Sequence, residues 1–203
     1  MTIKRKLANG DELFPLGIGA MRLPTKNNRI DKEKAREFIF YAIDNGVNFI
    51  DTAYSYHGGS SESFLGEILN EEDSQGVKYR DKVKICTKLP SINVRKYEDM
   101  EYYLDEQLKR LQRDSIDYYL IHSVDLKTVN RLLKRGLIDF LNKAKREGKI
   151  RHVGFSYHGV KEEFDLLIDG YDWDVVMVQY NYFDENVQAS TEGIEYAASK
   201  GMG

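Results

Sequence analysis

The sequence is poor in the features that define several classes of protein. It has one cysteine, Cys86, among 203 residues, which excludes an intrachain disulfide, a cysteine zinc site and an iron–sulfur cluster built within the chain. It has no apolar run near the roughly 18 residues of a membrane-spanning helix. Its basic N-terminal stretch lacks the apolar core of a secretory signal. These absences predict a cytoplasmic protein that does not bind membranes.

An excess of positive charge is also missing. Thirty Lys and Arg stand against 33 Asp and Glu, so the formal net charge is −3. Proteins that bind nucleic acid usually carry a basic excess, and this charge balance therefore argues against such a partner. Proline is scarce, with three in all, and no segment has the composition of an internal linker. The length and the lack of a linker favour a single domain.

What the chain does contain is a repeated alternation of short apolar runs and amphipathic segments. The segments between the runs place apolar residues at helical spacing, and the first predicted helix begins after a cap at Asp31 and stops at Gly46. Strands that alternate with helices indicate βαβ units and a parallel sheet. The six runs predicted as buried strands are 16–20, 47–51, 82–88, 116–122, 150–156 and 174–180.

Two parallel architectures compete, the doubly wound sheet and the (β/α)8 barrel. The first turn of a dinucleotide-binding doubly wound sheet needs a third glycine, but Arg22 stands at that position after Gly17 and Gly19. The reactive side chains follow several different strands, which is typical of a barrel. We therefore predict an α/β fold of the (β/α)8 TIM barrel type, of which this chain covers about the first six βα units. Residues 1–203 are expected to form the N-terminal part of one barrel domain.

Three polar side chains end consecutive predicted strands: Asp51, Lys88 and His122. Because parallel strands all end at one edge of the sheet, we expect these side chains at the same mouth, with Tyr56 reaching it from a loop. An ammonium beside a phenol makes the phenol a stronger acid, and a carboxylate keeps the ammonium charged and in place. A neighbouring histidine can hydrogen-bond a substrate oxygen as negative charge develops. The combination predicts a site that protonates a carbonyl while a hydride arrives from another molecule.

At these residues the sequence resembles the aldo-keto reductases. The stretch FIDTAYSYHGGSSE (49–62) is similar to the signature of that family, and TKLP, DYYLIH and VGFS are similar to its later motifs, in order and over essentially the whole chain. The resemblance implies a (β/α)8 barrel, NADPH bound without a Rossmann domain, and reduction of a small aldehyde or ketone. It places the catalytic tetrad on Asp51, Tyr56, Lys88 and His122, with Tyr56 as the proton donor.

The resemblance also implies a set of cofactor contacts, and we expect no metal site. In the family a Ser–Asn pair after the fifth strand and a Gln on the sixth hold the nicotinamide carboxamide. Ser156 and Gln179 match, whereas Tyr157 stands in place of the Asn, with His158 as a substitute donor. The family's phosphate-binding residues belong to the seventh and eighth units. The residues that match the cofactor loop after the first strand are Gly19, Ala20, Met21 and Arg22.

Within the family, YHGGSSE, TKLP, GFSYH and the run WD…QYNYFDE resemble a bacterial and archaeal branch whose members carry a C-terminal ferredoxin-like extension. The 203 residues contain no such extension, so a cluster domain or a redox partner is expected only in the full-length protein. Two alternatives stay open: a nucleotide-binding regulatory or scaffold protein with little turnover, and an inactive fragment of the reductase. The substrate is not identified, because specificity in such barrels lies in variable loops.

Overall fold

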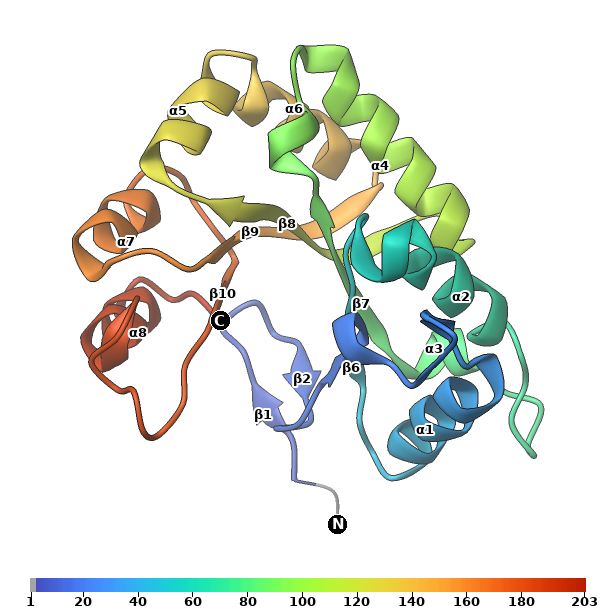
Figure 1. Cartoon of the computed structure of the whole chain (residues 1–203). Helices are drawn as coiled ribbons and strands as arrows, with labels where there is room; N and C mark the ends of the chain where they lie inside the picture. Colours follow the sequence, from blue (N-terminus) through green and yellow to red (C-terminus); the bar gives the residue numbers. More distant parts are fainter. Residues whose placement is uncertain (1–2) are drawn as a thin grey trace.

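The structure, a computed structural model, describes residues 3–203 and is built around a curled sheet of six strands (Figure 1). The strands lie in the order β3–β6–β7–β8–β9–β10, and every neighbouring pair is parallel. All six predicted strands are therefore present and in chain order. They are β3 (Ile18–Gly19), β6 (Phe49–Asp51), β7 (Lys84–Leu89), β8 (Ile116–Val124), β9 (Ile150–Tyr157) and β10 (Val175–Val178).

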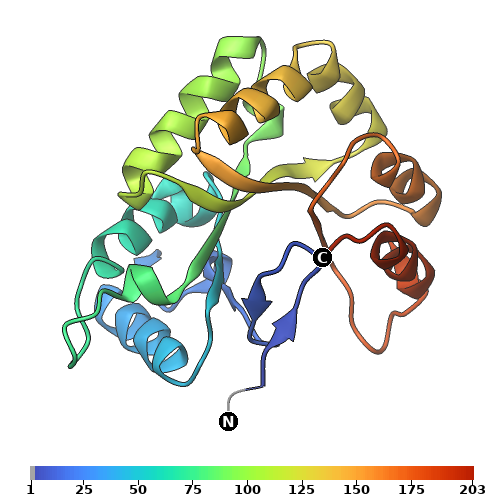
Figure 2. The same ribbon diagram turned by 180° about the vertical axis from the view of Figure 1, so that it is seen from behind.

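Helices cover the outer face of the curled sheet, so the molecule has the outline of an incomplete barrel in both views (Figures 1 and 2). The first helix begins where the sequence predicts, because the Asp31 carboxylate accepts a hydrogen bond from the backbone N–H of Lys34. No helix within residues 3–203 has the length and apolarity to cross a bilayer. The helices are α1 (Lys32–Asp44), α2 (Ser61–Ile68), α3 (Tyr79–Lys82), α4 (Tyr97–Leu111), α5 (Leu126–Leu133), α6 (Leu137–Arg146), α7 (Lys161–Ile168) and α8 (Ser190–Ser199).

The sheet separates two apolar regions, because alternate side chains of a strand point to opposite faces. The larger region lies between the sheet and the helices, where Tyr119 and Phe155 of the strands are buried. The smaller region lies inside the curl and is formed by Cys86, Tyr118 and Leu120. Burial raises the pKa of the Cys86 thiol well above its ordinary value, so Cys86 acts as an apolar core side chain and not as a nucleophile.

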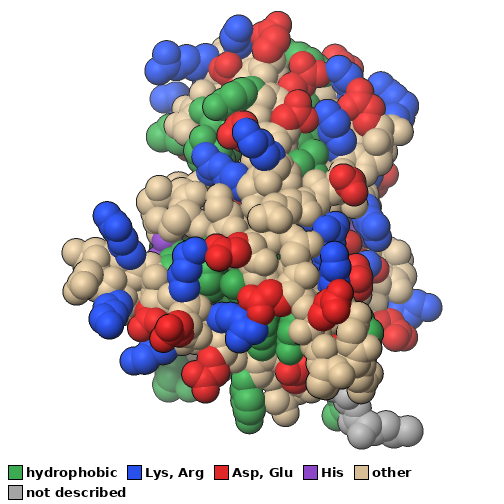
Figure 3. Space-filling model, turned by 90° about the vertical axis from the view of Figure 1, so that its right-hand side faces the viewer, with side chains coloured by type: hydrophobic (Ala, Val, Ile, Leu, Met, Phe, Trp, Pro, Cys, Tyr) green, Lys and Arg blue, Asp and Glu red, His purple; other side chains and the backbone are tan. Residues whose placement is uncertain are grey.

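The outer helices carry charges of both signs. Blue and red side chains are intermixed on the face shown in Figure 3. Lys32 of α1 and Glu67 of α2 form an ion pair of 2.6 Å, and Arg36 pairs with Glu71 beside it. Exposed pairs of this kind contribute roughly 0–1 kcal/mol each, so the free energy of folding comes mainly from the buried apolar face of the helices.

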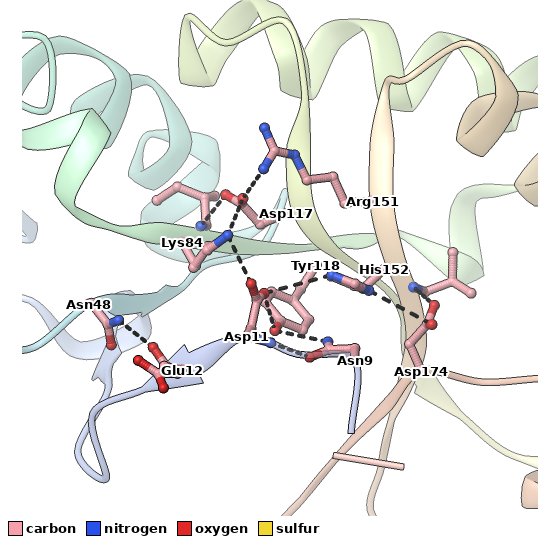
Figure 4. Close-up of polar contacts among 12 residues, drawn as sticks. Asn9, Asp11, Glu12, Asn48, Lys84, Asp117, Tyr118, Arg151, His152 and Asp174 are labelled. Atoms are coloured by element: carbon pink, nitrogen blue, oxygen red, sulfur yellow. Dashed lines mark hydrogen bonds and ion pairs between the residues drawn. The ribbon is translucent and has the colours of Figure 1, made fainter. Parts of the chain in front are cut away.

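A hairpin that the sequence analysis did not predict closes the amino-terminal end of the strands. Its two strands, β1 (Arg5–Lys6) and β2 (Glu12–Leu13), pair antiparallel. From its turn, Asp11 accepts a hydrogen bond of 2.6 Å from the Tyr118 hydroxyl and lies 3.1 Å from the Lys84 ammonium (Figure 4). These contacts bind the hairpin to the starts of β7 and β8 and leave the opposite end of the sheet open.

Short elements shape that opposite, carboxyl-terminal end. One is η1, which follows β3 and makes a contact with the loop after β6, where the backbone N–H of Leu23 donates to the His57 ring at 3.2 Å. These contacts place the loops after the first two strands side by side. The short elements are η1 (Ala20–Arg22), η2 (Tyr56–Gly59), η3 (Ser91–Asn93) and a second hairpin of β4 (Thr25–Lys26) and β5 (Arg29–Ile30).

Candidate active site

The carboxyl-terminal ends of β6, β7 and β8 bring the four predicted catalytic residues together. Asp51 ends β6, Lys88 and His122 lie near the ends of β7 and β8, and Tyr56 begins η2. The Lys88 ammonium stands at the centre: its Nζ donates to both Asp51 oxygens at 2.6 and 2.7 Å. It also donates to the Thr52 carbonyl at 2.8 Å and to the Tyr56 hydroxyl at 3.2 Å. These four acceptors engage all three N–H donors of the ammonium and fix its position.

Burial and pairing oppose each other in this cluster. Burial raises the pKa of Asp51 by more than the neighbouring Lys88 ammonium lowers it, so that the pKa of Asp51 lies above its ordinary value. Burial lowers the pKa of Lys88, but its interactions with the Asp51 carboxylate, and to a smaller extent with Cys86 and Tyr56, outweigh burial and leave that pKa above its ordinary value. Lys88, a residue that is 1% exposed, therefore stays an ammonium at neutral pH.

His122 is partly buried on the other side of the phenol. The centroid of its ring lies 6.0 Å from that of Tyr56, with the two planes at 79°. The Ser91 hydroxyl donates to the His122 carbonyl at 2.6 Å and holds this end of β8 in place. Burial, together with the charges of Lys88 and His158, lowers the pKa of His122 to about 4. His122 is therefore neutral at pH 7, with one ring N–H to donate.

We expect His122 to titrate at a pH near 4, far below the ordinary value of 6.5. The unfolded chain binds this proton as the pH falls through about 6.5, whereas the folded protein binds it only at about 4. The folded state therefore loses stability as the pH falls between these values. Side-chain NMR of the histidines measures the midpoint, and loss of one signal in His122→Asn assigns it. A midpoint near 6.5 would contradict the buried position beside Lys88.

A buried polar network behind Lys88 was missed by the sequence analysis. The Glu62 carboxylate of α2, which is fully buried, accepts hydrogen bonds from Thr87 at 2.6 Å and from the Gln107 amide at 2.7 Å. The same amide donates to the Lys88 carbonyl at 3.0 Å, and the Tyr119 hydroxyl donates to the Gln107 oxygen at 2.9 Å. The network ties α2 and α4 to the end of β7. Its sequence signal is a carboxylate and an amide at core positions of amphipathic helices.

We expect Glu62→Ala to lower the free energy of unfolding by about 3–5 kcal/mol. The change leaves the donors of Thr87 and Gln107, and the Arg110 guanidinium 3.4 Å from Glu62, without their acceptor. Urea denaturation measures the loss. The control is Glu67→Ala on the exposed face of the same helix, which is expected to cost less than about 1 kcal/mol. Equal losses in the two variants would show that the network does not stabilise the fold.

The side chains predicted to hold a carboxamide lie at the same end of the sheet. Ser156, buried near the end of β9, accepts a hydrogen bond of 2.8 Å from the backbone N–H of Ser123, which leaves its own hydroxyl proton available. Gln179 follows β10, and its oxygen accepts from Gln188 at 2.9 Å. Among residues 3–203 its NH2 group has no hydrogen-bond acceptor. A hydroxyl donor and an amide donor fit the carboxamide of a nicotinamide.

The residue at the expected Asn position points the other way. Tyr157 is buried on the helix-facing side of β9, where its hydroxyl donates to the Val160 carbonyl at 2.6 Å and its ring lies 5.2 Å from that of Phe164. This orientation removes Tyr157 from the mouth of the sheet. His158, next along the chain, is exposed, and its role as a substitute donor stays a prediction.

The predicted cofactor loop after β3 is exposed in three of its four residues, Gly19, Met21 and Arg22. Ala20 is buried, and its carbonyl accepts a hydrogen bond of 3.3 Å from the Ser61 hydroxyl. The loop is therefore anchored to the start of α2, and Ala20 can offer a ligand only its backbone. A role of these four residues in cofactor binding stays a prediction.

Together, the curled parallel sheet and the four side chains at its mouth define an α/β protein shaped as part of a barrel, with a cluster of titratable side chains at the carboxyl-terminal end of its strands. The model of the Aldo/keto reductase family matches residues 15–203. The chain belongs to this family, and the family prediction made from the motifs is confirmed.

Two curated relatives show the extent of the likeness. The chain is 29% identical to the L-galactose dehydrogenase of Arabidopsis thaliana over 203 residues, a match that covers 98% of this chain and 62% of the relative. It is 26% identical to the NADH-specific methylglyoxal reductase of Escherichia coli over 189 residues, which covers 87% of this chain and 58% of the relative. The chain thus spans about three fifths of the length of these relatives.

Solved structures carry the same fold. The holo form of an aldo-keto reductase from Bacillus halodurans has a TM-score of 0.79 at 25% identity, and the match covers 100% of this chain and 64% of that one. An aldo-keto reductase from Klebsiella pneumoniae in complex with NADPH has a TM-score of 0.77 at 21% identity, and the match covers 98% of this chain and 66% of that one. The prediction of an α/β fold that forms part of a (β/α)8 barrel is confirmed.

Proposed function

We propose that this chain provides the acid–base site of a reductase that converts a small aldehyde or ketone into an alcohol with NADPH, with Tyr56 as the proton donor. The position of the Lys88 ammonium carries this proposal, because Nζ contacts Asp51, the Thr52 carbonyl and the Tyr56 hydroxyl at once. The Tyr56 oxygen accepts from Lys88, so the proton of the phenol is left to point toward a substrate.

Each residue of the site has a distinct task in this reaction. Lys88 stabilises the negative charge that remains on the Tyr56 oxygen once its proton has left, and Asp51 holds Lys88 charged and in place. Neutral His122 donates its ring N–H to the carbonyl oxygen, orients it and stabilises the charge that develops there. When bound, the nicotinamide supplies the hydride.

The proposed cofactor site uses Ser156 and Gln179 for the carboxamide, beside the loop of Gly19, Ala20, Met21 and Arg22. The free donors of Ser156 and Gln179 support it, as does the NADPH in the similar structure from Klebsiella pneumoniae. The relative from Escherichia coli is named as NADH-specific, so the preference of this chain for NADPH is a separate point to test.

We further propose that residues 1–203 are the first six βα units of one barrel domain that works in the cytoplasm. The edge of β10 that faces away from β9 supports a barrel, because the chain that follows α8 returns to this edge and pairs with it. On that edge the backbone N–H of Gly203 donates to the Asp174 carbonyl at 3.1 Å, and that of Val176 donates to the Gly203 carbonyl at 2.9 Å. A barrel places its next strand at this edge.

The function is tested by mixing the protein that contains this chain with NADPH and a series of aldehydes. We expect aldehyde-dependent loss of the nicotinamide absorbance, matched by alcohol formation, and slower loss when NADH replaces NADPH. Binding of NADPH without any turnover would contradict the reductase and favour a regulatory role.

A further inference from the structure

A pocket of about 400 Å³ lies beside His122, between the loop after β7 and helix α5. Its size suits a small molecule. His122 is shared between this pocket and the proposed acid–base site, so a molecule in the pocket can present a group to that site. The side chains that the argument uses are His122, Ile92 and Arg131.

The charge of this pocket is unbalanced. Among residues 3–203, Arg131 is the one arginine or lysine in its wall, and no aspartate or glutamate lines it. His122 is neutral at pH 7 because its pKa is lowered to about 4. Asp125, at the other end of α5, is engaged by the backbone N–H of Thr128 at 2.6 Å. The wall of the pocket therefore carries a net positive charge.

The Arg131 guanidinium is held in place by the backbone. Its two terminal nitrogens donate to the Val94 carbonyl at 2.7 Å and to the Ser91 carbonyl at 2.8 Å. Among residues 3–203 no carboxylate lies within 4.0 Å of it. A guanidinium has five N–H donors, so three are left for another group. A fixed cation with free donors binds an anion with little loss of side-chain freedom.

We propose that this pocket takes the anionic group of the carbonyl substrate, a carboxylate or a phosphate, with Arg131 as its partner. The inference rests on the proposed function, since the carbonyl of the same molecule would lie at His122. Planar arginine matches both anions through paired hydrogen bonds. The exposed side chain of Ile92, on the rim, offers apolar contact for the carbon skeleton between the two groups.

Arg135 provides a matched control for Arg131. It lies one turn further along the chain and donates to the same Val94 carbonyl at 2.9 Å, but it does not line the pocket. Loss of either guanidinium removes a bond to that carbonyl. Only loss of Arg131 removes the positive charge from the pocket.

The test is calorimetric binding of 4-carboxybenzaldehyde and of its methyl ester to the folded protein. We expect the acid to bind more tightly than the ester. Arg131→Gln should lower the affinity for the acid by at least about 10-fold and leave the affinity for the ester unchanged. Arg135→Gln should leave both affinities within about two-fold of those of the unaltered protein. Added salt should weaken the binding of the acid and leave the binding of the ester unchanged. Glyceraldehyde 3-phosphate against glyceraldehyde then shows whether phosphate or carboxylate is preferred.

Equal binding of acid and ester by the unaltered protein would overturn the proposal, as would equal losses in the Arg131 and Arg135 variants. If Arg131→Gln does not fold, the comparison of acid with ester and the salt series, both on the unaltered protein, still test the proposal. Binding requires no turnover, so the two proposals fail separately. Selective binding of the acid without NADPH oxidation would contradict the proposed reductase activity alone. Reduction of acid and ester with equal KM would contradict the proposed anion pocket alone.

Discussion

Tyr56→Phe is expected to lower kcat for carbonyl reduction by about 100-fold or more and to leave the affinity for NADPH nearly unchanged. The substitution removes one oxygen and its proton and keeps the ring. That ring lies 4.8 Å from the Lys88 ammonium and 6.0 Å from the His122 ring, and neither packing contact depends on the hydroxyl. The loss therefore falls on proton donation and not on the shape of the site.

Steady-state kinetics measure the loss of kcat, and NADPH titration of the same preparation measures the cofactor affinity. Tyr41→Phe is the control, because Tyr41 is 70% exposed on α1 and its hydroxyl takes no part in the site. Activity of Tyr56→Phe within a few-fold of the unaltered protein would show that another group donates the proton.

Lys88→Met is expected to reduce activity at every pH and to move the alkaline limb of the pH–rate profile to higher pH. The Tyr56 phenol loses the ammonium 3.2 Å away that favours its deprotonated form. The same change leaves Asp51 buried without its cation. Breaking a buried ion pair by removing one partner costs about 3–5 kcal/mol, so a large loss of stability accompanies the loss of activity.

The loss of stability in Lys88→Met should depend on pH in a defined direction. Burial already raises the pKa of Asp51, and without Lys88 that pKa rises further. A group whose folded pKa is raised favours the folded state below its unfolded pKa and loses this effect as the pH rises through the folded pKa. The stability deficit of the variant relative to the unaltered protein is therefore expected to be largest at neutral pH and to shrink as the pH falls toward about 4.

Denaturation at several pH values and the pH–rate profile measure the two effects of Lys88→Met. The double change Lys88→Met with Asp51→Asn removes the buried charge, so it should regain stability without regaining activity. Lys84→Met is the matched control, because Lys84 lies at the other end of β7 and pairs with Asp11. A pH–rate profile with an unmoved alkaline limb would mean that Lys88 does not act on the phenol.

The sequence by itself determined the order of the strands and the position of the proposed catalytic cluster. Its apolar runs repeat with the period of βαβ units, and parallel strands all end at one edge of the sheet. Residues at successive strand ends must then share that edge, whatever the details of packing. This is why Asp51, Lys88 and His122 could be placed together, and why Tyr56 could be assigned to the loop above them.

Only the tertiary structure decided which side chains support that cluster. The contacts of Glu62 with Gln107, of Asp11 with Tyr118 and of Arg131 with Ser91 join residues that lie 45, 107 and 40 positions apart. No local pattern encodes such distant pairs, since each depends on how a helix or hairpin packs against the sheet. A periodic pattern states which residues are buried, but the partner that satisfies a buried polar atom is chosen by packing alone.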